Sequence, residues 1–186
     1  MRSIAFAACA ALLLALASFL PARAQATWSE YQSEEGGFTV ELPDSAQIQP
    51  EMPLLIKLGD TILLCSAWAV PFEDPAADNS LFLALYADFP QEYFAPDPGK
   101  GANIIVDSMF AKMFFRPGIK SIHSENHQRD GYLNRNYSLY NAETKELIQL
   151  RCYVIGRRFY ALEAVSRRQN DDAFRFVESF KLLKKE

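Results

Sequence analysis

The sequence lacks the short motifs that identify several common classes of enzyme. It contains no Gly-x-Ser-x-Gly, His-Glu-x-x-His, Gly-x-Gly-x-x-Gly or phosphate-binding loop. Histidine is scarce as well, because His123 and His127 are the only two. A Ser-His or Cys-His catalytic pair would have to use one of them. We therefore expect a protein that is not an enzyme and has no cofactor.

Positive charge is also in short supply. The chain carries 19 Lys and Arg against 23 Asp and Glu, a net charge of −4. Nucleic acids and anionic lipids are recognised by clustered positive charge. The cluster of Lys181, Lys184 and Lys185 follows a predicted C-terminal helix, where cations offset the helix dipole. We expect no nucleic-acid partner.

Long apolar runs are absent except at the N-terminus, from Ile4 to Leu20. This run follows Arg2 and precedes Ala22-Arg23-Ala24 and Ala24-Gln25-Ala26, which is the pattern of a bacterial secretory signal peptide. It is short for a membrane-spanning helix. We predict a signal peptide at 1–24 and a single domain at 25–186 that is periplasmic or secreted. A lipid-modified Cys9 is the alternative, although Phe6-Ala7-Ala8 matches a lipoprotein signal poorly.

Cleavage would leave two cysteines, Cys65 and Cys152. An oxidising compartment permits a disulfide between them. Closing so long a loop would stabilise the fold by about 4–5 kcal/mol in the chain-entropy model. The other interpretation is two buried free thiols on neighbouring core strands.

Strand patterns dominate the rest of the chain. Two short strands surround the turn Glu34-Glu35-Gly36-Gly37, and two more surround Gly59-Asp60. Residues 61–70 are apolar on both faces, which predicts a central strand covered on both sides. Another apolar strand occupies 80–89. Four strands in a meander follow at 119–128, 132–140, 146–155 and 158–166.

Two helices accompany these strands. Residues 102–115 place Ile105, Met109 and Met113 in one row, which is typical of an apolar helix face. The second helix follows Asn170, a favourable N-cap, with Asp171 and Asp172 in its first turn. An antiparallel sheet flanked by two helices is an α+β fold.

The opening "WSEYQSEEGGFTVELP" and the ending "RCYVIGRRFYALEAV…FVESFKL" resemble the PsbP-like (DcrB-like) family of exported bacterial proteins. The resemblance spans about residues 28–183, but the middle of the chain fits less well. The matching positions are Phe38, Val40, Pro43, Arg151, Tyr153, Val154, Gly156, Arg158, Tyr160, Leu162, Ser179 and Phe180. The resemblance implies an α/β/α sandwich whose relatives mostly bind or chaperone other proteins and are not known as enzymes.

Metal-ligating residue types gather in "HSENH", where His123, Glu125 and His127 share one face of a strand. The two histidine backbones lie about 13 Å apart at that spacing, so we expect a polar edge strand and no metal site. Arg135 falls on the apolar face of its strand and needs a partner. Glu163 is the expected partner; contact with water or with a bound anion are the alternatives.

Two aromatic residues, Tyr93 and Phe94, lie in a loop that Pro90, Pro96 and Pro98 keep out of any strand ladder. They are the candidate partner-binding residues if they are exposed; otherwise they cap the core. The sequence thus predicts a non-catalytic exported binding or assembly module with an unidentified protein partner. The alternative is a periplasmic protein that binds a small molecule or a metal, with weak hydrolase activity through His123 or His127.

Overall fold

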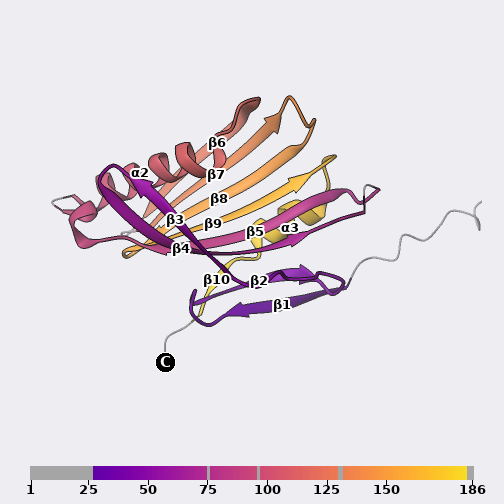
Figure 1. Cartoon of the computed structure of the whole chain (residues 1–186), viewed down its shortest axis with the longest axis horizontal. Coiled ribbons are helices and arrows are strands. Elements are labelled where there is room, and N and C mark those ends of the chain that lie inside the picture. Colours follow the sequence, from indigo (N-terminus) through magenta and orange to yellow (C-terminus); the bar gives the residue numbers. More distant parts are fainter. Residues whose placement is uncertain (1–26, 75, 96, 130–131, 184–186) are drawn as a thin grey trace, which may run out of the picture.

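The structure, a computed structural model, describes residues 27–74, 76–95, 97–129 and 132–183. The predicted signal peptide at 1–24 lies outside these residues. The described strands form two antiparallel sheets (Figure 1). The small sheet has the order β1-β2-β10, with β1 Trp28–Ser33, β2 Phe38–Pro43 and β10 Lys181–Leu182.

The large sheet has seven strands in the order β3-β4-β5-β9-β8-β7-β6. Its strands are β3 Met52–Leu58, β4 Thr61–Pro71, β5 Asn79–Asp88, β6 Ile119–Arg129, β7 Tyr132–Asn141, β8 Leu147–Ile155 and β9 Arg158–Ser166. The meander predicted from the sequence is therefore confirmed, because β6 to β9 are neighbours in chain order.

Helices cover both faces of the large sheet (Figure 1). On one face, α2 Pro98–Met109 packs against a core that includes Leu85, Leu150 and Phe159. On the other face, α3 Asp171–Glu178 and the small sheet bury Trp68 and Phe82. Each strand of the sheet centre is therefore buried on both sides. The α+β class, an antiparallel sheet flanked by helices, is confirmed.

The first helix begins earlier than the prediction of 102–115. Asp97 caps it by accepting a hydrogen bond from the backbone N–H of Lys100 at 3.1 Å, and Pro98 takes the first helical position. After Met109 the helix widens into the π-helix η2, Phe110–Phe114, where Phe115 N–H donates to the carbonyl of Phe110. None of the helices in the described ranges has the length and apolar character to cross a membrane.

The prediction for 61–70 is wrong in its first half. β4 lies second from the edge of the sheet, and Ile62 and Leu64 are exposed. Only from Ala67 onward does β4 have cover on both faces, where Trp68 and Val70 meet the small sheet and α3. An apolar residue pattern could not reveal where the covering sheet ends.

Both described cysteines are free, buried thiols. Cys65 lies on β4 and Cys152 on β8, with β5 and β9 between them. Three strand spacings amount to about 14 Å, twice the reach of a disulfide between Cα atoms. The free-thiol interpretation is confirmed, except that the two strands are not neighbours.

Candidate functional site

The small sheet and α3 cover only the centre of one face of the large sheet. Two flanks of that face stay open to solvent. One, at β3 and β4, is apolar; the other, at β6 and β7, is polar. We call the first the apolar flank and define it by Leu55, Ile62 and Leu64.

The apolar flank consists of large aliphatic side chains that nothing in the described chain covers. Leu55 and Leu64 are direct cross-strand neighbours, and Ile62 lies diagonally across from Leu55. The exposed fractions of Leu55, Ile62 and Leu64 are 75%, 66% and 61%. Single exposed aliphatic residues are ordinary, but adjacent ones on one sheet face are typical of an interaction surface.

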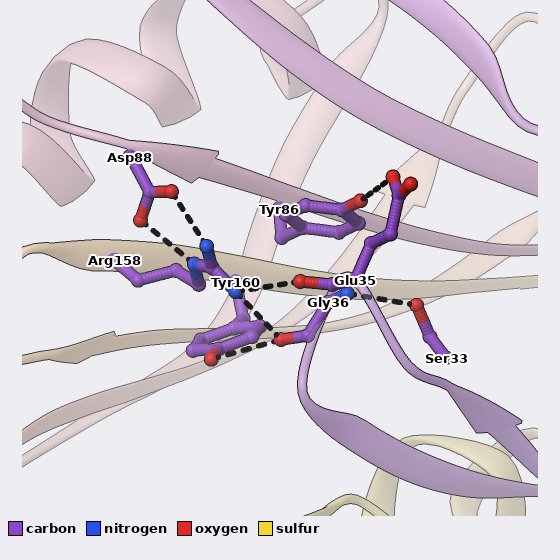
Figure 2. Close-up of polar contacts among 7 residues, drawn as sticks. All are labelled: Ser33, Glu35, Gly36, Tyr86, Asp88, Arg158 and Tyr160. Atoms are coloured by element: carbon purple, nitrogen blue, oxygen red, sulfur yellow. Dashed lines mark hydrogen bonds and ion pairs between the residues drawn. The ribbon is translucent and has the colours of Figure 1, made fainter.

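A hollow of about 500 Å³ adjoins this flank. Ile62 and Leu64 form its apolar side, and Ser66, Tyr86 and Glu35 its polar side. The Tyr86 hydroxyl donates to Glu35 Oε2 at 3.5 Å (Figure 2). The hollow therefore places a carboxylate directly beside exposed aliphatic side chains.

Arg158 fixes the turn that carries Glu35 (Figure 2). Its Nη1 donates to the backbone carbonyls of Glu35 and Gly36, at 2.8 and 3.1 Å. Its Nε and Nη2 donate to the two carboxylate oxygens of Asp88, at 2.7 and 2.6 Å. The guanidinium thus ties the turn between β1 and β2 to the large sheet.

Gly36 is held from both sides. The Tyr160 hydroxyl donates to its carbonyl at 3.2 Å, and its own N–H donates to Ser33 Oγ at 3.1 Å (Figure 2). A Cβ on Gly36 would lie 2.4 Å from the Phe38 ring. Only glycine fits here, which explains a glycine directly after Glu35.

The ionisable groups of this network are shifted in consistent directions. The hydrogen bonds from Arg158 lower the pKa of Asp88, and those to Asp88 raise the pKa of Arg158. Burial raises the pKa of Tyr86 to about 12. At neutral pH the site therefore contains a charged Arg158–Asp88 pair and a neutral Tyr86 hydroxyl.

The motifs that carried the family resemblance meet at this network. Phe38 comes from the opening motif, and Arg158 and Tyr160 come from the closing motif. Gly156 and Arg157 form the two-residue turn before Arg158. The φ of Gly156 is 62°, a conformation that favours glycine. Their roles are to hold the turn at 34–37 against β9, so these residues position the site.

The predicted pairing of Arg135 with Glu163 is wrong. Arg135 reaches across to α2, where its Nη1 contacts Asp107 and its Nη2 donates to Asn103 Oδ1 at 2.5 Å. Glu163 is 2% exposed, and its nearest charged neighbour is Arg116 at 3.9 Å. The cause is geometric: Asn103 and Asp107 lie one helical turn apart on the same face of α2, directly above β7.

His123, Glu125 and His127 lie on β6, an exposed edge strand as predicted. The two imidazole Nε2 atoms lie 3.0 and 3.4 Å from separate oxygens of Glu125. Within the described residues, no group of three histidine, cysteine, aspartate or glutamate side chains has metal-binding geometry.

Of the two alternatives for Tyr93 and Phe94, exposure for partner binding does not hold for Phe94 and holds only in part for Tyr93. Phe94 is 6% exposed and belongs to the core under α2, while Tyr93 is half-buried with its ring edge against Phe89. The short helix η1, Gln91–Phe94, turns both rings inward. The backbone of Tyr93 passes so close to α2 that a Cβ on Gly101 would lie 2.0 Å from its carbonyl oxygen. The pair acts as a cap on the core.

The apolar flank was missed from the sequence. Its signal was present in "MPLLIKL", where apolar residues occupy both parities of an edge strand. One parity, Leu54 and Ile56, packs against the core on the face of the large sheet that α2 covers. The other parity is left without a covering layer.

Comparisons with known proteins leave the family open. No family model matches the chain, and no curated protein matches it. The solved structures that are similar include two with low identity and low TM-scores. The solution structure of cyanobacterial PsbP (CyanoP) from Synechocystis sp. PCC 6803 has 10% identity and a TM-score of 0.48, over 87% of this chain and 95% of that one. PA94, a protein of unknown function from Pseudomonas aeruginosa, has 11% identity and a TM-score of 0.36, over 78% and 85%. Values this low show no family membership, so the PsbP-like assignment stays a prediction.

Proposed function

We propose that this chain is a non-catalytic, exported protein that binds a protein partner through the apolar flank. The observation that carries the proposal is the exposure of Leu55, Ile62 and Leu64 side by side on one sheet face. Burying such side chains in an interface contributes about 25 cal/mol for each Å² of apolar surface removed from water. Aliphatic patches of this kind mark protein contact sites.

The hollow beside the flank restricts the chemistry of the partner. Its apolar side accepts an aliphatic or aromatic side chain, and the Glu35 carboxylate favours a lysine or arginine next to it. The negative net charge of the chain also favours a basic partner. We therefore expect a partner segment that combines an apolar side chain with a neighbouring basic residue.

The site is also prepared for binding before the partner arrives. Arg158 and Tyr160 hold the turn that carries Glu35. The backbone of this turn therefore loses little conformational entropy on binding. Preorganisation of this kind lowers the entropic cost of association.

The experiment starts from a photo-crosslinking amino acid at position 64 in the exported protein. The crosslinked partner is identified, purified and titrated with the mature chain. We expect Leu64→Asp to weaken binding at least tenfold, because interface anchors contribute about 2 kcal/mol or more. Adding Glu35→Lys to this variant should weaken binding further, because a lysine repels the basic residue of the partner. Ile122→Asp is the matched control, since Ile122 is a strand residue with 63% exposure at the opposite edge of the sheet.

Equal affinity of the wild type and Leu64→Asp for the purified partner would overturn the proposal. So would an equal loss in Ile122→Asp, because it would reflect a general effect of added charge. Circular dichroism of each variant separates a lost contact from a lost fold.

A further inference from the structure

The second open flank of the sheet face presents a regular array of hydrogen-bonding side chains. In register across β6, β7 and β8 lie His123, Ser138 and Gln149 in one row and Glu125, Asn136 and Arg151 in the next. Opposed residues in an antiparallel sheet share a face. We call these six residues the polar flank.

The polar flank forms the floor of a small groove of about 150 Å³ beside α3. Phe174 and Val177 of α3 contribute an apolar wall. The groove thus combines a polar floor with an apolar side, the lining that gives small-molecule sites both affinity and orientation.

The ionisable side chains of the groove already have partners within the protein. Arg151 Nη2 donates to Glu178 at 2.7 Å, and His123 Nε2 lies 3.0 Å from Glu125. An ionic ligand would have to compete with these partners. What stays available is neutral: the amides of Asn136 and Gln149 and the hydroxyl of Ser138.

The neutral groups have unused hydrogen-bonding capacity. The buried amide oxygen of Asn136 has no partner among the described residues. Ser138 Oγ donates to Gln149 Oε1 at 2.9 Å, which leaves the Gln149 amide nitrogen to donate elsewhere. A 180° rotation of the Asn136 amide exchanges its oxygen and nitrogen, so it can offer either one to a ligand. Buried polar groups without partners are rare in folded proteins and call for an explanation.

We propose that the polar flank binds a neutral carbohydrate. Each sugar hydroxyl both donates and accepts a hydrogen bond, which matches a floor of amides and a hydroxyl. The C–H face of a sugar ring packs against Phe174, the partly exposed side chain of the apolar wall. The site is independent of the apolar flank, since the two lie toward opposite edges of the sheet.

Saturation-transfer NMR and calorimetry on the mature chain test this proposal, with cellotriose, maltotriose and the trimer of N-acetylglucosamine as probes. We expect at least one trimer to bind. Asn136→Ala and Gln149→Ala should each weaken it about tenfold, the loss that one or two hydrogen bonds carry. Asn126→Ala is the matched control, because Asn126 is an exposed asparagine on the opposite face of β6.

Unchanged affinity in Asn126→Ala with weakened binding in the other two variants supports the site. If the wild type binds none of the three trimers at millimolar concentration, the proposal is overturned. Equal weakening in all three variants overturns it as well. If Asn136→Ala does not fold, Gln149→Ala and Ser138→Ala decide the question, since both side chains line the same groove.

Discussion

Arg158 and Asp88 form a two-pronged ion pair between the ends of β9 and β5, and the same guanidinium also holds the turn between β1 and β2 (Figure 2). Asp88 and Arg158 are direct neighbours in the sheet register. The ion pair therefore fixes the direction of the guanidinium, whose remaining Nη1 then reaches the two carbonyls of the turn. The small sheet is positioned by a side chain of the large one.

Replacing Arg158 with alanine should lower the free energy of unfolding by about 2 kcal/mol, in the range for hydrogen bonds to charged groups. Arg158→Lys should recover only part of this loss, because an ammonium cannot match the carboxylate and both carbonyls at once. Urea unfolding measures the effect. Arg157→Ala is the control, since Arg157 is the exposed neighbour and surface substitutions shift stability by about 0.5 kcal/mol or less. Equal losses in Arg157→Ala and Arg158→Ala would contradict the assigned role.

Phe94→Ala should destabilise the fold by about 3–5 kcal/mol, as expected for a phenylalanine removed from a packed core. Tyr93→Ala should cost less, because its ring is only half-buried against Phe89. Gln91→Ala, an exposed change in the same short helix, serves as the control and should be nearly neutral. Thermal and urea unfolding report the order. A Phe94→Ala variant as stable as Gln91→Ala would contradict the assignment of the two rings as a cap on the core.

Much of the fold could be predicted because local patterns determine it. Ile148, Leu150, Cys152 and Val154 alternate with polar residues, and the strand they predict, β8, is present with these side chains buried. The turn predicted at Gly156 is likewise present between β8 and β9, because the glycine allows its positive φ. Such features depend on residues close in sequence.

The sites were harder to predict because they depend on where layers end. β4 has the composition of a doubly covered strand, yet Ile62 and Leu64 lie outside the area that the small sheet and α3 cover. The partner of Arg135 shows the same limit. Strand parity placed Arg135 on the correct face, but the choice between Glu163 and Asp107 required knowing that α2 lies above β7.

The two thiols should be inert in the folded protein. Burial raises the pKa of Cys65 to about 11, and complete burial raises the pKa of Cys152 as well. At mildly alkaline pH only roughly one Cys65 in a thousand would be a thiolate, the reactive form. For Cys65 and Cys152 we expect no labelling by a thiol reagent in buffer and labelling of both in denaturant. A reductant should leave the melting temperature unchanged; a drop of several degrees would show that a disulfide exists.

Glu163 should make stability fall as the pH rises. Burial raises its pKa in the folded state, and Arg116 at 3.9 Å offsets this only in part. The folded pKa therefore lies above the unfolded one. The bound proton stabilises the fold fully below the unfolded pKa, and this contribution is lost as the pH rises through the folded pKa.

Glu163→Gln, which resembles the protonated acid, isolates this effect from the other carboxylates. Asp88 has a lowered pKa and contributes the opposite trend, but it is present in both proteins. We expect equal melting temperatures at acidic pH and a variant that becomes progressively more stable than the wild type toward alkaline pH. The Arg116→Ala variant with Glu163 in place should be still less stable relative to Glu163→Gln at alkaline pH. The reason is that this change removes a nearby cation that lowers the pKa of Glu163. A difference between Glu163→Gln and the wild type that stays constant across the pH range would mean that Glu163 does not titrate in the folded protein.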